Sequence, residues 1–120
     1  MHQTLQDIEI IVVDDASTDN TFEVLQSCTD KRVTLIRHEV NKGGGAARNS
    51  GIKLSSGRYI AFLDSDDSWH QDKLQLQVQK LNELDSEWGG VYSGRIDVIG
   101  DHRVAVVPQS EGRFVSDVLT

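Results

Sequence analysis

The stretch IEIIVVDD, residues 8–15, opens with a run of β-branched side chains and closes with two aspartates. A continuous apolar run of this kind is typical of a strand buried on both faces of a parallel sheet, and we expect this strand over residues 8–13. The segments RVTLIRH (32–38) and RYIAFL (58–63) predict a second and a third strand. The first and third of these strands would each end in acidic side chains.

Helical patterns separate the predicted strands. Ser17, Thr18 or Asp19 could each cap a helix whose apolar face buries Cys28, the single cysteine of the chain. The glycines and alanines within residues 41–57 indicate a loop that leads into a helix. Strand and helix alternating in this order favour an α/β sheet, in which ligands bind beyond the carboxyl ends of the strands.

The rest of the chain predicts one more helix and then a pair of strands. Apolar side chains recur at spacings of four and three from Gln71 onward, as an amphipathic helix requires; they are Leu74, Val78, Leu81 and Leu84. Residues 88–108 indicate strands that turn at Gly100 and Asp101. We expect one small domain, because 120 residues with 38% hydrophobic side chains suffice for a single core.

Charge and hydropathy exclude several classes of function. The formal net charge of -7 argues against nonspecific binding to nucleic acid or to an anionic membrane, since both reward a basic surface. No apolar stretch approaches the about 20 residues that cross a bilayer. The single cysteine allows no intrachain disulfide and is compatible with the cytoplasmic location that we expect. The four histidines, at positions 2, 38, 70 and 102, lack the spacing of metal ligands, and we interpret them as surface residues.

The acidic cluster Asp64, Asp66 and Asp67 allows two interpretations. Carboxylates this close repel each other unless a cation lies beside them, and their hard oxygen atoms suit Mg²⁺ or Mn²⁺, with water and substrate phosphate completing the coordination. Asp and Ser are also ordinary turn formers, so a solvated turn explains the same letters. Taken alone the stretch favours the turn, and its position directly after a buried strand shifts the balance toward the metal site.

The other two polar segments are equally ambiguous when each is taken alone. Gly43, Gly44 and Gly45 permit close approach of a ligand to the backbone and Arg48 could bind phosphate, but the same residues also fit a flexible connection with a surface charge. Asp14 and Asp15 could accept hydrogen bonds from a base or a ribose, or could simply cap a turn.

Together these segments resemble a known family. QTLQDIEIIVVDDASTDNT (3–21), NKGGGAARNSGI (41–52) and GRYIAFLDSDDSWHQDKL (57–74) resemble family 2 glycosyltransferases with the GT-A fold, both in order and in spacing. The likeness covers residues 3–84 well and becomes general over residues 88–120. It implies an α/β, Rossmann-like GT-A fold for nucleotide-diphospho-sugar transfer, here one incomplete domain over 1–120 with donor binding in 3–84 and the start of the acceptor side in 85–120.

The resemblance also implies roles for individual residues. Asp15, with Asp14 beside it, would recognise the nucleotide base, commonly the uracil of a UDP-sugar. Arg48 would line the nucleotide pocket in a loop shaped by Asn41 and Gly43. Asp64 and Asp66 would form the family's DxD motif, in which the first aspartate faces ribose or sugar and the second holds the divalent metal, Mn²⁺ or Mg²⁺, on the diphosphate. The donor sugar would pass to a sugar, lipid or polysaccharide acceptor, usually with inversion.

Two departures from the family pattern shape the expectation. The usual first strand and the region with the catalytic base are not visible, so the chain is expected to be a fragment that holds the donor half and lacks turnover. None of the late carboxylates, Asp97, Asp101 and Glu111, is assigned as the base. Open sheet edges would favour a homodimer or strand exchange. The full-length protein could associate with a membrane.

Two further functions fit parts of the pattern. A Mg²⁺-binding phosphoacceptor receiver domain also has an acidic pair after one strand and an aspartate after another, but it leaves Arg48, Asn49 and Asp66 without a role. A noncatalytic nucleotide-sugar-binding module would share the donor site and lack the acceptor chemistry.

Overall fold

The computed structural model describes residues 2–85 and 88–107. The chain divides into two compact units: the first unit is Leu5–Trp69, and the second unit is formed by the residues up to Thr4 together with those from His70 onward. Both units combine polar loops with regular helices or strands. The predicted functional boundary at residue 85 stays a prediction.

A pair of parallel strands forms the centre of the first unit. Strand β1 (Ile10–Asp14) pairs with β2 (Val33–Arg37), so that Ile10 lies opposite Val33 and Asp14 lies opposite Arg37. The first two predicted strands and their parallel pairing are therefore confirmed. Because parallel strands end at the same edge, the residues after Asp14 and after Arg37 are brought together.

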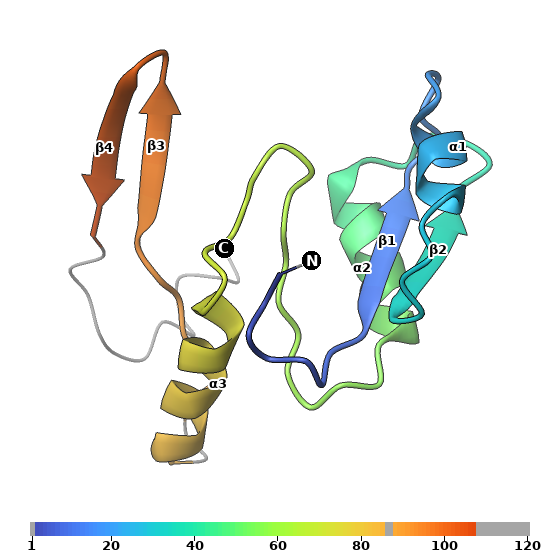
Figure 1. The fold of residues 1–120 in the computed structure, drawn as a ribbon. Helices are drawn as coiled ribbons and strands as arrows, with labels where there is room; N and C mark the ends of the chain where they lie inside the picture. The colour runs from blue at the N-terminus through green and yellow to red at the C-terminus, as the bar shows by residue number, and fades with distance from the viewer. Residues whose placement is uncertain (1, 86–87, 108–120) are drawn as a thin grey trace. The chain divides into compact units, whose positions relative to one another are not determined.

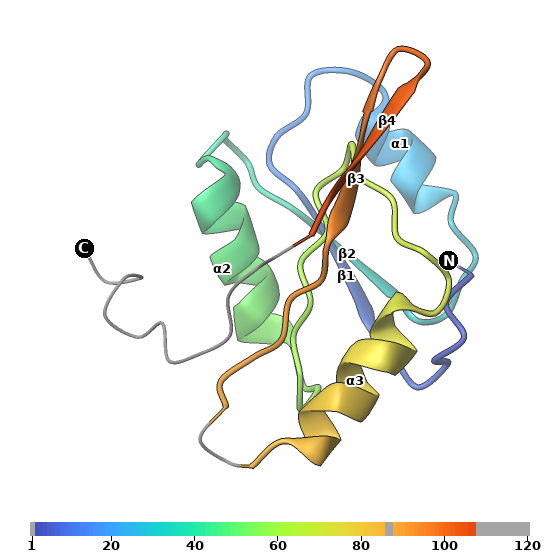
Figure 2. The same ribbon diagram turned by 90° about the vertical axis from the view of Figure 1, so that its left-hand side faces the viewer.

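Two helices lie on opposite sides of this strand pair (Figures 1 and 2). Helix α1 covers Thr21–Gln26 and helix α2 covers Gly44–Leu54. A Cβ atom at Gly51 would lie only 3.7 Å from Cγ2 of Val13, so glycine at this position lets α2 approach β1 closely. The alternation of β1 side chains toward two helices explains its uninterrupted apolar sequence.

The start and end of α1 refine two expectations. None of the three proposed capping residues is the N-cap of α1, which is Asn20, although Asp19 accepts a hydrogen bond from the backbone N–H of Thr21 (3.1 Å). The prediction that Cys28 is buried within the helix is wrong, because α1 ends at Gln26 and the thiol-bearing residue is only half-buried. The short helix reflects the turn formers Ser27 and Thr29–Asp30 that follow it.

The predicted third strand over residues 58–63 is not present among the described residues. This segment is apolar, but a strand needs a neighbouring strand for its backbone hydrogen bonds, and within the described residues β1 and β2 pair with each other and with no third strand. Ile60, Phe62 and Leu63 consequently stay about half exposed, at 47%, 52% and 48%. The expected pairing of an open sheet edge with a second chain stays a prediction.

The second unit contains helix α3 (Lys73–Glu83) and an antiparallel hairpin of β3 (Arg95–Ile99) and β4 (His102–Val106). The hairpin turn contains Gly100 with a φ of +60°, a conformation that glycine adopts without strain. Both the amphipathic helix and the turn at residues 100–101 are confirmed. Gln3 supports the start of α3, because its Oε1 accepts the backbone N–H of Leu74 at 3.1 Å.

Candidate functional site

Asp14, the last residue of β1, is buried, and its two carboxylate oxygens have different surroundings. Its Oδ1 accepts the backbone N–H of Ser17 at 3.0 Å, while Oδ2 accepts no hydrogen bond and lies 3.2 Å from Nε of Arg37. Hydrogen bonding from Ser17, with help from the charge of Arg37, lowers the pKa of Asp14 even though burial opposes the change. Asp14 is therefore a charged carboxylate, and in this form it holds the turn that follows β1.

Asp15 binds the loop that precedes α2. Its Oδ1 accepts the backbone N–H of Lys42 at 2.9 Å, and its Oδ2 accepts that of Gly43 at 2.7 Å. The side chain of Asn41 donates to the backbone carbonyl of Asp15 at 3.2 Å. The structure therefore brings together three predicted site residues, namely Asp15, Asn41 and Gly43.

His38 completes the surroundings of Asp15. Its Nδ1 lies 2.6 Å from Oδ1 of Asp15, and its Nε2 lies 2.9 Å from Oγ of Ser50 on α2. The hydrogen bond from His38, followed by those from the backbone at Lys42 and Gly43, holds the pKa of Asp15 below its usual value against the effect of burial.

The interpretation of all four histidines as surface residues is wrong for His38, which is only 7% exposed. His2, His70 and His102 are exposed as expected. The sequence carried a signal for the difference: His38 follows the second strand, so the strand-end rule that grouped the aspartates also applies to it. The sequence also provided no prediction for Ser50, which lies two residues after Arg48 on α2.

Gly43 shapes the loop between β2 and α2. It has a φ of +84°, in the region that side-chain-bearing residues rarely adopt. Among the described residues other than its chain neighbours, no atom lies within 4 Å of the place where a Cβ would be, so the conformation of the backbone, and not crowding, requires glycine here. Gly44 and Gly45 already belong to α2 and have no such requirement.

The glycine segment and the acidic cluster meet through one ion pair. Nη2 of Arg48 lies 2.6 Å from Oδ1 of Asp64, and both side chains are about half exposed. Two predicted site residues that lie 16 positions apart are thereby adjacent. An exposed ion pair of this kind contributes only about 0–1 kcal/mol, so a ligand can separate the two side chains at small cost.

The acidic cluster forms an exposed turn. The backbone N–H of Asp67 donates to the carbonyl of Asp64 at 3.1 Å, and the carboxylate of Asp66 points to no hydrogen-bonding partner within the described part of the chain. Across residues 2–85 and 88–107, no three His, Cys, Asp or Glu side chains are grouped to hold a metal ion. Two carboxylates fit a hard divalent cation whose remaining positions are taken by water and phosphate oxygens.

A cavity of about 410 Å³ lies at the carboxyl end of β1, within the first unit. Its lining combines the end of this strand with α1 and the acidic turn, and comprises Val12, Val13, Asp14, Asp15, Ser17, Thr21, Leu25 and Ser65. The volume lies within the range of small-molecule sites. The cavity thus coincides with the edge at which the sequence predicted ligand binding.

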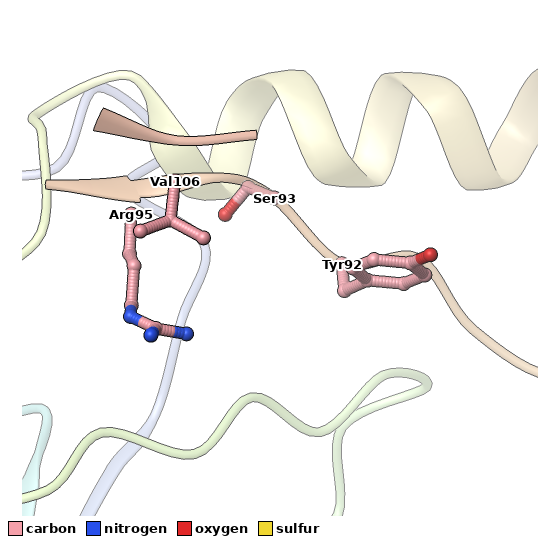
Figure 3. Close-up of a pocket in the computed structure, with 4 residues that line it drawn as sticks. All are labelled: Tyr92, Ser93, Arg95 and Val106. Carbon is pink, nitrogen blue, oxygen red and sulfur yellow. The ribbon is translucent and has the colours of Figure 1, made fainter. Parts of the chain in front are cut away.

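A smaller cavity, of about 220 Å³, lies in the second unit. Figure 3 shows the four residues that line it, Tyr92, Ser93, Arg95 and Val106, at the hairpin and in the segment that precedes it. None of the predicted site residues takes part. The expected role of this region on the acceptor side remains untested, and Glu111 lies outside the described residues.

Comparison with known proteins identifies the family. Residues 1–116 match the family described as glycosyl transferase family 2. The chain belongs to this family. Its mixed helices and strands fit an incomplete α/β GT-A fold, so the predicted fold class is confirmed and the receiver-domain alternative loses its basis.

Several curated relatives are similar to this chain in sequence. The UDP-Glc:alpha-D-GlcNAc-diphosphoundecaprenol beta-1,3-glucosyltransferase WfaP of Escherichia coli is 45% identical over 78 residues, covering 65% of this chain and 31% of that protein. The enzyme WfgD of Escherichia coli, named for the same reaction, is 38% identical over 117 residues, covering 97% of this chain and 42% of that protein. The putative teichuronic acid biosynthesis glycosyltransferase TuaG of Bacillus subtilis is 46% identical over 77 residues, covering 62% of this chain and 31% of that protein.

The family 2 chain spans less than half the length of these three relatives. The family assignment rests on the matched residues, whereas the activity of a whole protein needs its acceptor side as well. No helix within residues 2–85 and 88–107 combines the length and the apolar character that a membrane crossing requires.

Proposed function

We propose that this chain supplies the donor-binding part of a metal-dependent glycosyltransferase, and that the donor is a UDP-sugar. The observation that carries the proposal is the cavity of about 410 Å³ lined by Asp14, Asp15 and Ser65 at the carboxyl end of β1. Ligands of open α/β sheets bind at this edge. The printed names of two relatives, WfaP and WfgD, also specify UDP-Glc as the donor.

Within this proposal Asp15 recognises the base, and Asp14 holds the turn beside it. The Asp15 side chain is 17% exposed, so part of the carboxylate surface remains for a donor group of the nucleotide. Asn41 and Gly43 shape the loop, and Arg48 faces the nucleotide phosphates. Arg48 contacts Asp64 through Nη2 and Oδ1, and its guanidinium can exchange this carboxylate for phosphate oxygens, which a guanidinium can bind bidentately.

Asp64 and Asp66 are proposed to bind the ribose or sugar and the metal ion, respectively. A divalent ion, Mn²⁺ or Mg²⁺, would stabilise the negative charge that grows on the diphosphate as the bond to the anomeric carbon breaks. Both carboxylates are exposed, which suits a cation that arrives with the nucleotide. We propose no catalytic base within this chain and therefore expect donor binding without transfer.

The acceptor and the location belong to the proposal for the whole protein. The names of WfaP and WfgD specify alpha-D-GlcNAc-diphosphoundecaprenol as the acceptor, and we propose a lipid-linked sugar of this class. The transferase would then act on the cytoplasmic side, at the membrane surface that holds such a lipid.

Calorimetric titration of UDP, with and without Mn²⁺, tests the donor site on the native chain and on Asp66→Ala. We expect UDP binding that depends on the metal and is lost in Asp66→Ala. The control is Asp67→Ala, which removes an adjacent carboxylate of the same turn and should bind UDP as the native chain does. Absence of nucleotide binding by the native chain with either metal ion would overturn the proposal.

A further inference from the structure

The backbone of His38 is held by the strand pair, independently of the contacts of its side chain. It directly follows β2, and its backbone N–H donates to the carbonyl of Asp14 at 2.9 Å, which continues the pairing of β1 and β2 by one residue. The side chain is only 7% exposed. The imidazole is therefore held at the strand edge that also carries the acidic pair.

The contacts of the ring determine which nitrogen carries the proton. Nδ1 lies 2.6 Å from the Asp15 carboxylate, which can only accept, so Nδ1 is the donor. Nε2 lies 2.9 Å from Oγ of Ser50, and the neutral ring accepts the Ser50 hydroxyl there. A protonated ring would donate to the same oxygen atom. Both nitrogens are thus paired in either charge state, and the orientation of the ring is fixed.

Fixing the ring also fixes the Asp15 carboxylate. Besides His38, this carboxylate accepts the backbone N–H groups of Lys42 at 2.9 Å and Gly43 at 2.7 Å. Those two donors belong to one short loop, whereas His38 directly follows β2. Without His38, the Asp15 carboxylate loses its contact with the end of β2 and can shift together with the loop that it binds.

Ser50 links the same ring to the other predicted binding group. Ser50 and Arg48 belong to α2, and Arg48 contacts Asp64 of the acidic turn at 2.6 Å. The loop held by Asp15 leads into this helix through Gly43. One imidazole therefore connects the end of β2, the base-recognising carboxylate and the helix that carries the phosphate-facing arginine.

We propose that His38 is a positioning residue of the donor site, which orients Asp15 through Nδ1 and is itself anchored by Ser50. This inference rests on the proposed UDP site. His38 touches no substrate in this scheme: it acts through Asp15 and the loop of residues 41–44. A positioning residue of this kind typically changes affinity by about 10- to 100-fold when it is removed, by analogy with the residues that orient metal ligands.

Three replacements of His38 distinguish a role in orienting Asp15 from a role in filling space only. The amide of Asn places a donor close to the position of Nδ1, so His38→Asn retains the bond to Asp15 and loses the one to Ser50. The longer Gln places its amide near Nε2, so His38→Gln reaches Ser50 and misplaces the donor to Asp15. His38→Leu retains apolar volume and loses both bonds.

The dissociation constant of UDP with Mn²⁺, measured by calorimetry, is the first readout. We expect about 10-fold or greater weakening in His38→Leu and His38→Gln, and affinity within a few-fold of the native chain in His38→Asn. Thermal unfolding verifies that each variant is folded. If His38→Leu does not fold, the contrast between Asn and Gln decides.

Ser50→Ala and an NMR measurement provide the second readout. Ser50→Ala should weaken UDP binding less than His38→Leu, since the bond to Asp15 remains. In the native chain, the Nδ1–H resonance of His38 should shift when UDP is added with Mg²⁺ and should not shift with Mg²⁺ alone.

Two outcomes are distinguishable. Equal UDP affinity in the native chain, His38→Gln and His38→Leu would overturn the positioning role and leave the donor site intact. A native chain that binds no UDP would overturn the proposed function and this inference with it.

Discussion

Two kinds of carboxylate lie at the same edge of the first unit. Asp15 has a side chain that is 17% exposed, and it accepts hydrogen bonds from His38 and from two backbone N–H groups. The side chain of Asp64 is 58% exposed and forms an ion pair with Arg48, while the side chain of Asp66 has no protein partner in the described residues. The first carboxylate is prearranged by the fold, and the others are free to meet a ligand.

Another hydrogen-bonded carboxylate, that of Glu9, lies at the opposite end of β1. The Oε1 atom of Glu9 accepts the backbone N–H groups of Ser56 at 2.7 Å and Gly57 at 2.9 Å, and the Ser56 hydroxyl at 3.0 Å. Glu9 thus holds the segment that follows α2 as Asp15 holds the segment that precedes it. Carboxylates that accept several backbone hydrogen bonds stabilise the fold, whereas those that accept none can serve binding, and three substitutions test this division.

The largest effect on folding should come from Gly43→Ala. The φ of +84° at Gly43 would cost a side-chain-bearing residue about 1–2 kcal/mol, and the loop could avoid that cost only by breaking the bond to Asp15. Urea unfolding followed by circular dichroism measures the change in the free energy of unfolding.

Gly45→Ala is the matched control for this substitution. Gly45 lies in the first turn of α2, has no positive φ, and leaves open space for a methyl group. Alanine there should leave the free energy of unfolding equal or slightly raised. Equal losses at positions 43 and 45 would contradict the special role of the Gly43 backbone.

An intermediate effect is expected from Glu9→Gln, and it should depend on pH. Hydrogen bonding, first from the backbone of Ser56, lowers the pKa of Glu9 from its usual value of 4.5. A carboxylate with a lowered folded-state pKa contributes stability above pH 4.5, and that contribution disappears as the pH falls through the folded-state pKa. Glutamine cannot titrate, so the variant should be less stable at pH 7 and should approach the native chain in acid.

Thermal unfolding from pH 7 to pH 3 measures this convergence. Asp67→Asn is the control, because Asp67 is an exposed carboxylate of the acidic turn. Its unfolding curve should follow that of the native chain at every pH. A constant difference between Glu9→Gln and the native chain across the range would show that titration of Glu9 does not contribute.

The smallest effect on stability, and the sharpest on binding, should follow from Arg48→Ala. Loss of an exposed ion pair should change the free energy of unfolding by less than about 1 kcal/mol. Removal of the positive charge beside Asp64 should strengthen the binding of Mn²⁺ alone and weaken that of UDP with Mn²⁺. Calorimetric titration of each ligand measures both changes, and a parallel change in the two affinities would contradict the proposed exchange of partners.

The parts of the fold that depend on local patterns were predictable. The apolar run of β1, the alternation of β2, the periodic face of α3 and the glycine at the β3–β4 turn each determine an element through residues that are close in sequence. The segment 58–63 has an equally apolar pattern but no neighbouring strand, and so it forms none. Pairing is a contact between distant residues, which a local pattern does not contain.

The candidate site divides in the same way. The sequence by itself determined the family, the acidic strand end, the glycine loop and the acidic turn, because these are contiguous letters with a fixed spacing. Only the tertiary structure decided that His38 contacts both Asp15 and Ser50 and that Arg48 faces Asp64. These contacts join residues 12 to 23 positions apart, and they exist because parallel strands end at one edge and α2 packs against β1.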